Sequence, residues 1–145
     1  MSPEPPVYRI MGVDPGITTG FAILDYPGDG RPVSIFLGEL FIKDDVPNAL
    51  RLLAEEWSPH VVVVEDTPKF ISGFKGIQQL HTLRSEINAV FPSLSWITPG
   101  VWKIPPVLEM ASFLGVGKGP HIRDAIGITL FWSMFREKEI ASDLP

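Results

Sequence analysis

Cysteine is absent from the 145 residues of this sequence. Without it the chain has no disulfide bond, no thiolate nucleophile and no zinc site built on cysteine, so metal ligands must come from carboxylates and three histidines. Long apolar runs are also missing. None approaches the roughly 18–20 residues of a membrane helix, and the first residues lack the basic flank and apolar stretch of a signal peptide. We therefore expect a cytoplasmic protein with no membrane partner.

Basic residues are outnumbered, because Lys and Arg total 12 against 17 Asp and Glu, for a formal net charge of −5. This balance argues against a protein that coats nucleic acid by charge alone, so any phosphate contact must come from local basic patches or metal ions. Hydrophobic residues make up 45% of the chain, and its length suits a single core. We expect a flexible proline-rich arm over residues 1–6, one domain over residues 7–140 and a frayed tail over residues 141–145.

The hydrophobic pattern predicts an α/β organisation. Three strand candidates come first and most simply form an antiparallel meander, and a run of four valines over residues 61–64 predicts a central strand buried on both faces. Prolines and glycines separate the strands from segments with apolar residues at helical spacing. The result is a mixed sheet flanked by helices, with strands over residues 7–13, 20–24, 33–42, 61–64 and 94–98 and helices over residues 45–58, 77–90, 107–114 and 120–139.

Three acidic residues stand at the ends of predicted elements: Asp14 after the first strand, Glu65 after the valine run and Asp124 in the first turn of the last helix. If the first and fourth strands are parallel neighbours, Asp14 and Glu65 meet at one edge of the sheet. Two carboxylates at such a short distance repel each other unless cations bind between them. Mg²⁺ binds a few carboxylates and keeps coordination sites for water and phosphate. His121 lies three residues before Asp124, on the same helix face.

Each of these residues also has an ordinary structural interpretation. Asp14 precedes Pro-Gly and is a common turn former, and Asp124 can simply complement the helix dipole. Glu65 is harder to explain in this way, because an acidic pair directly after four valines is costly to place near a core. Asp66 competes with Glu65, but neighbours on a strand point to opposite faces, and we choose Glu65 as the partner of Asp14.

Three blocks of the chain together resemble the RuvC family of Holliday junction resolvases. They are GVDPGITTG at residues 12–20, Val-Val-Glu ending at residue 65, and HIRDA at residues 121–125, and the resemblance spans roughly residues 8–135. It implies a ribonuclease H-like fold, in which a five-stranded mixed sheet of three antiparallel and then two parallel strands has helices on both faces. The short length and proline-rich start fit a phage-type member, in the cytoplasm of a bacterium or a phage-infected host.

The resemblance also implies a dimeric endodeoxyribonuclease that depends on Mg²⁺ and nicks two opposed strands of a four-way DNA junction. Two ions per site, about 3.5–4 Å apart, would hydrolyse the phosphodiester, and Mn²⁺ would substitute. Asp14 would bridge the ions, Glu65 and Asp124 would be further ligands, and His121 stands where family members carry Asp or His. The implied catalytic and metal residues are therefore Asp14, Glu65, His121 and Asp124.

DNA contacts are expected from basic and aromatic side chains in or beside loops near this site. Phe70 and Phe74 are candidates to stack on unpaired bases at the crossover, although either ring can equally belong to the core. A two-fold symmetric junction is bound most simply by a two-fold symmetric dimer. The apolar stripe of the helix over residues 77–90 either contacts the partner subunit or packs on its own sheet. The expected DNA-binding residues are Lys69, Phe70, Phe74, Lys75, His81, Arg84, Lys103 and Lys118.

Two other functions remain open. The segment from Asp14 to Gly20 also resembles the phosphate loop of actin-like ATPases, but those proteins enclose a nucleotide between two such domains and this chain has room for one. An RNA-processing nuclease of the YqgF type would share the expected fold, although its first block usually carries a basic residue where Thr18 and Thr19 stand here. We expect no nucleotide cofactor.

Overall fold

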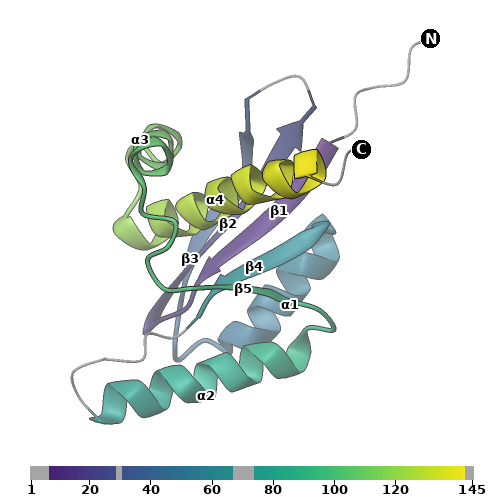
Figure 1. Cartoon of the computed structure of the whole chain (residues 1–145). Coiled ribbons are helices and arrows are strands. Elements are labelled where there is room, and N and C mark those ends of the chain that lie inside the picture. Colours follow the sequence, from purple (N-terminus) through teal and green to yellow (C-terminus); the bar gives the residue numbers. More distant parts are fainter. Residues whose placement is uncertain (1–6, 29–30, 67–73, 143–145) are drawn as a thin grey trace.

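The computed structural model describes residues 7–28, 31–66 and 74–142, with backbone only for residues 74–77 and 135–142. Five strands form one sheet in the order β3-β2-β1-β4-β5 (Figure 1). The pairs β1–β2 and β2–β3 are antiparallel, and β1–β4 and β4–β5 are parallel. The strands are β1 (Val7–Asp14), β2 (Thr18–Pro27), β3 (Val33–Phe41), β4 (Val61–Glu65) and β5 (Ser95–Ile97). The expected mixed sheet, with three antiparallel strands followed by two parallel ones, is confirmed.

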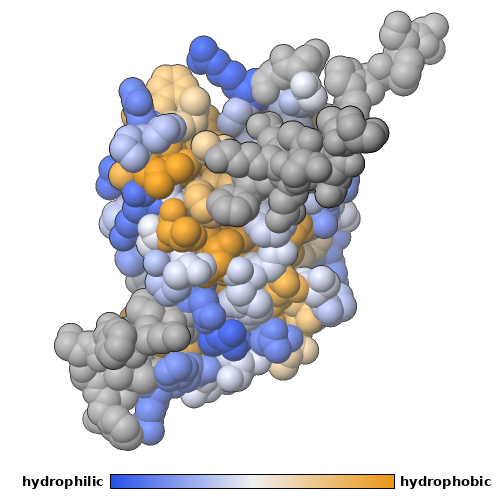
Figure 2. All heavy atoms as spheres, in the orientation of Figure 1, coloured by the Kyte–Doolittle hydropathy of each residue, from blue (hydrophilic) through white to orange (hydrophobic). Residues whose placement is uncertain are grey.

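Helices cover both faces of the sheet, as expected (Figure 1). One face packs against α3 and α4 through a core that includes Ile10, Val63 and Ile126, and the other packs against α1 and α2 through a core that includes Val13 and Leu50. On the side shown in Figure 2, apolar side chains gather around α3 and toward the centre, within a polar surround. The helices are α1 (Val46–Trp57), α2 (Phe74–Val90), α3 (Pro105–Leu114) and α4 (Pro120–Ser142).

The valine run forms the strand that its composition predicts. Successive side chains of β4 alternate between the two cores, with Val63 on the α4 side and Val62 and Val64 on the α1 side. Both faces of β4 pack against a hydrophobic core, so alternate positions cannot be polar. This explains why the four valines follow one another without interruption. The strand lies beside β1, where Val13 pairs with Val64, so the two strands end together.

The stripe of α2 packs largely within its own chain. Leu83 and Ile87 are buried in the core on the α1 side of the sheet. The helix begins at Phe74, three residues earlier than the sequence predicts, and α4 continues to Ser142. In the part of the chain that the structure describes, no helix is both long and apolar enough to cross a membrane.

Two glycines allow α4 to lie very close to the sheet. A Cβ atom on Gly20 of β2 would stand 2.0 Å from the carbonyl oxygen of His121, and one on Gly12 of β1 would stand 2.5 Å from that of Ala125. Both carbonyls belong to the backbone of the first turns of α4, so neither can rotate away. Only glycine at these two positions permits the observed separation between helix and sheet.

We predict that Gly20→Ala lowers the free energy of unfolding by about 3 kcal/mol, because the new methyl group would push the helix off the sheet. Urea denaturation of the purified variant measures this change. Gly119→Ala is the matched control, since its Cβ would meet only the flexible carboxylate of Glu39, at 2.9 Å from Oε1. Equal stability of the two variants would contradict the proposed contact.

Candidate active site

The structure brings Asp14, Glu65, His121 and Asp124 to one end of the sheet. Asp14 is the last residue of β1 and Glu65 the last residue of β4, the parallel neighbour of β1. His121 and Asp124 lie in the first turns of α4, which the contact with Gly20 holds against the same edge. The predicted meeting of carboxylates from three elements is therefore present in the fold.

The charges of these side chains act on one another at short range. The Nδ1 atom of His121 lies 4.0 Å from Oδ2 of Asp14. The pKa of Asp14 is raised from 3.8 to about 8, first by burial and then by the negative charges of Glu65 and Asp124 and a hydrogen bond with Glu65, while the positive charge of Lys103 lowers it. Burial also raises the pKa of Asp124. The cluster thus holds more negative charge than its protein neighbours neutralise.

Glu65 is held in place by the loop that follows β5. Its Oε2 atom accepts two hydrogen bonds, from the backbone N–H of Gly100 at 2.9 Å and from the indole Nε1–H of Trp102 at 2.6 Å. Trp102 is only 2% exposed, and its ring packs against Gly127 of α4, where a Cβ atom would stand 2.4 Å from the ring. Trp102 therefore links the β4 carboxylate to the helix that carries Asp124.

Trp102 was not among the site residues predicted from the sequence. A signal for it exists, because a buried tryptophan needs an acceptor for its N–H and here the nearest acidic strand end supplies one. Periodicity could not identify that acceptor, which lies 37 residues away in the chain.

Asp66 points to a different partner from Glu65. Its carboxylate forms an ion pair with Arg84 of α2, and the Arg84 guanidinium lies 4.3 Å from the centre of the Trp96 ring. The two adjacent acidic residues at the end of β4 thus serve separate contacts. The sequence interpretation, in which only one of them shares a side with Asp14, agrees with this arrangement.

The predicted DNA-binding residues are dispersed around the site. Lys103 is near enough to lower the pKa values of Asp14 and Asp124, and Lys118 is exposed in the loop before α4. His81 is exposed on α2, and Arg84 is engaged with Asp66. Lys69 and Phe70 lie outside the described residues, as do the side chains of Phe74 and Lys75.

The chemistry of the cluster suits a hard divalent cation. Carboxylate oxygens are the ligands that Mg²⁺ prefers, and such an ion would offset both the burial of Asp14 and its repulsion by Glu65 and Asp124, the causes that raise its pKa. Among the residues that the structure describes, no group of three or more His, Asp or Glu side chains is close enough to enclose an ion as it stands. Asp14, Glu65 and Asp124 would have to adjust their rotamers to ligate one together.

The acidic cluster reaches the surface at His121, while Asp14 lies mostly buried. The His121 side chain is 44% exposed and that of Asp14 is 16% exposed. A cavity of about 450 Å³ lies at the opposite end of β4, where its lining includes Arg51, His60 and Phe91, and it contains none of the acidic cluster. An acidic cluster that reaches the surface at His121 is accessible to a large substrate lying across that surface.

We predict that Asp14→Asn stabilises the metal-free protein above pH 4. The raised pKa means that the folded state keeps a proton that the unfolded chain releases between pH 4 and 8, so the stability of the wild type falls as pH rises through this range. The variant does not lose stability in this way, so its free energy of unfolding at pH 8 should exceed that of the wild type by on the order of 2–4 kcal/mol. Urea titrations in EDTA at pH 4, 6 and 8 test this, and a constant difference across the series would contradict it.

Comparison with known proteins completes the description. No family model matches the chain, and no curated protein sequence matches it. Among solved structures, Thermus thermophilus RuvC in complex with a Holliday junction substrate is similar at a TM-score of 0.73 and 14% identity, over 90% of this chain and 96% of that chain. The yeast mitochondrial Holliday junction resolvase Ydc2 matches at a TM-score of 0.65 and 16% identity, over 90% of this chain and 81% of that one.

A viral protein shows the same likeness at a greater structural distance. The fowlpox virus resolvase, in a complex with Holliday junction DNA, matches at a TM-score of 0.53 and 15% identity, over 91% of this chain and 98% of that chain. The described architecture is thus the ribonuclease H-like fold of RuvC-type resolvases. The resemblance of the three sequence blocks is confirmed at the level of the fold.

Proposed function

We propose that this chain, which has the fold of RuvC-type resolvases, is a Mg²⁺-dependent endodeoxyribonuclease that resolves four-way DNA junctions. The observation that carries the proposal is the convergence of Asp14, Glu65 and Asp124, with His121 beside them, at one open edge of that fold. The solved structures with this fold include two resolvases described in complexes with Holliday junctions. Their substrate supports branched DNA as the substrate here.

The proposed reaction is hydrolysis of a phosphodiester bond. Asp14, Glu65 and Asp124 would hold the ions, which when bound supply activation of water and stabilisation of the charge that develops on phosphate. Glu65 enters this role already oriented by Gly100 and Trp102. The half-exposed imidazole of His121 is placed to exchange a proton with the water or the leaving oxygen. Lys103 offers a positive charge to the phosphate beside the carboxylates.

The alternatives account for fewer of these observations. An actin-like ATPase needs a second domain, whereas the chain covers 96% of the length of the Thermus RuvC structure with its one domain. An RNA nuclease of the same fold would use the same carboxylates, so the choice between RNA and branched DNA depends on substrate tests. The cleavage panel for this protein should therefore contain both.

We propose that the active form is a two-fold dimer, because each chain has a single acidic cluster and resolution of a junction requires two symmetric cuts. Leu83 and Ile87 of α2 are committed to their own core. Contact with a partner through this helix would therefore use its outward face, which includes Gln78, His81 and Thr82.

We predict that Asp14→Asn abolishes cleavage of a labelled four-way junction in Mg²⁺ and leaves junction binding intact or tighter, because one negative charge facing phosphate is removed. Gel analysis with four-way, linear and RNA substrates measures both properties. Asp66→Asn is the matched control, since its carboxylate faces Arg84, and it should keep most of the activity. Full nicking by Asp14→Asn would remove the acidic cluster from the mechanism.

Divalent ions should stabilise the fold, and Trp102→Phe should weaken that effect. At an ion concentration 100 times the dissociation constant, the wild type should gain about 2.7 kcal/mol. The phenylalanine keeps the ring against Gly127 but removes the donor to Glu65, so the Mn²⁺ concentration for half of the shift in melting temperature should rise about 10-fold to 100-fold. Trp96→Phe serves as control, and equal Mn²⁺ midpoints for the two variants would remove the role given to Trp102.

We predict that the protein in solution has the mass of a dimer and that its cleavage product is linear DNA. Light scattering should give about twice the 16.0 kDa of the chain in the presence of junction DNA. On a supercoiled plasmid that extrudes a cruciform, the main product should be linear, because both strands are cut in one encounter. A monomeric mass together with nicked circles would instead favour a single-strand nicking enzyme of this fold.

A further inference from the structure

An exposed apolar patch lies next to the acidic cluster, and the proposed chemistry does not use it. It consists of Ile17, Phe41 and Ile42, whose exposed fractions are 59%, 50% and 37%. Ile17 belongs to the turn that follows Asp14, and Phe41 ends β3. The backbone N–H of Ile42 donates to the carbonyl of Ile17 at 2.9 Å, so the turn and the strand end form one continuous surface.

The strand register places Phe41 on the same face of the sheet as Asp14. Asp14 pairs with Gly20, and Gly20 pairs with Glu39, so these three positions form one row across β1, β2 and β3. Residues directly opposite each other in a sheet share a face, and so do residues two apart in a strand. Phe41 is two residues beyond Glu39 on the same face, and it pairs with Thr18 in the next row past the one that contains Asp14.

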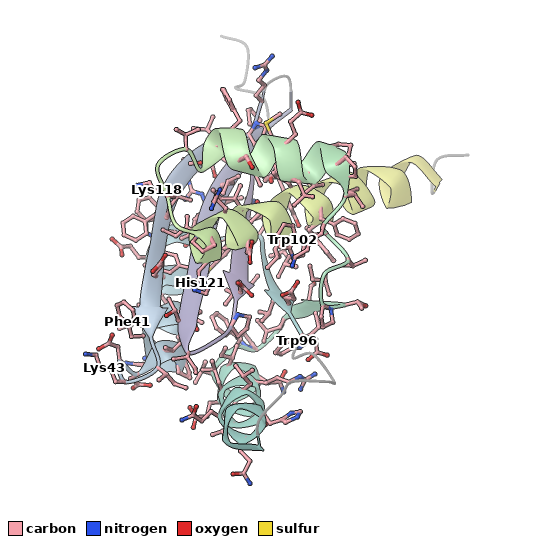
Figure 3. All side chains as sticks on the ribbon, turned by 90° about the vertical axis from the view of Figure 1, so that its left-hand side faces the viewer. Phe41, Lys43, Trp96, Trp102, Lys118 and His121 are labelled. Atoms are coloured by element: carbon pink, nitrogen blue, oxygen red, sulfur yellow. The ribbon has the colours of Figure 1, made fainter. Side chains whose placement is uncertain are left out.

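Exposed charges of both signs lie near Phe41, because Asp44 and Asp45 follow Lys43 in the chain and the backbone N–H of Asp44 donates to the carbonyl of Phe41 at 2.8 Å. Lys43 is exposed just after the patch, and Lys118 is exposed in the loop before α4. Gly119 of that loop lies against the carboxylate of Glu39, which belongs to the row that contains Asp14. In the view of Figure 3, Lys118, Phe41 and Lys43 lie on the same side, and His121 lies further toward the centre.

We infer that Phe41, backed by Ile17, is a stacking site for an unpaired base of the DNA strand that enters the active site, with Lys43 contacting a flanking phosphate. The inference rests on the proposed nuclease function. An aromatic ring beside a cation is the arrangement that binds single-stranded nucleic acid without regard to sequence, since every base offers a π-face. The continuity of the patch with the acidic edge favours nucleic acid over a protein partner, and a junction provides such bases at its branch point.

The experiment uses the full chain with Asp14→Asn, which should bind junctions without cutting them, and a four-way junction with 2-aminopurine at the branch point. Stacking quenches the fluorescence of this base. Adding Phe41→Ala should raise the dissociation constant for the junction about tenfold and abolish the quenching, while Phe41→Trp should keep both near their starting values. Phe113→Ala is the control, because Phe113 is 66% exposed on α3 and lines a cavity with Arg31, away from the cluster.

The possible results separate the inference from the function on which it rests. Equal binding and quenching by the Phe41→Ala and Phe113→Ala proteins would overturn the stacking site and leave the nuclease proposal standing. Failure of the Asp14→Asn protein to prefer a junction over linear duplex would overturn both. Melting temperatures of all variants should stay near that of the parent, since both phenylalanines are at least half exposed.

Discussion

The close contact between α4 and the first two strands is the constraint on which the site depends. Gly12 and Gly20 let the helix backbone approach the sheet closely enough that a Cβ atom at either position would collide with a carbonyl oxygen. His121 and Asp124 reach Asp14 because of this contact. The glycines at the two ends of the 12–20 segment are therefore packing residues, and the aspartate between them is the proposed metal ligand.

A second contact joins the remaining carboxylate to the same helix. Trp102 donates to Glu65 and seats its ring on Gly127 of α4. Asp66, the next residue after Glu65, is tied to α2 through Arg84. The end of β4 is thus fixed from both faces of the sheet, and hydrogen bonds hold Glu65 in place beside Asp14.

Much of this arrangement could be predicted from the sequence, because its causes are local. The valine run specifies a strand buried on both faces, and the carboxyl ends of parallel neighbours must meet, which brings Glu65 to Asp14. The contacts that were not predicted join distant residues without any periodic signal. The Trp102–Glu65 hydrogen bond spans 37 residues, and the exposure of Phe41 depends on β3 being an edge strand. The ion pair of Arg84, a predicted DNA-binding residue, with Asp66 joins helix to sheet and likewise has no local signal.

The origin of α4 at the far end of the chain also determines when the site can exist. Its acidic residue, Asp124, packs beside strands from the start of the sequence, so the ribosome makes all five strands before it makes the helix that completes the cluster. Contacts between the two ends of a chain form late, since the long loop between them must first be closed. The acidic cluster can therefore be complete only after synthesis has passed the start of α4.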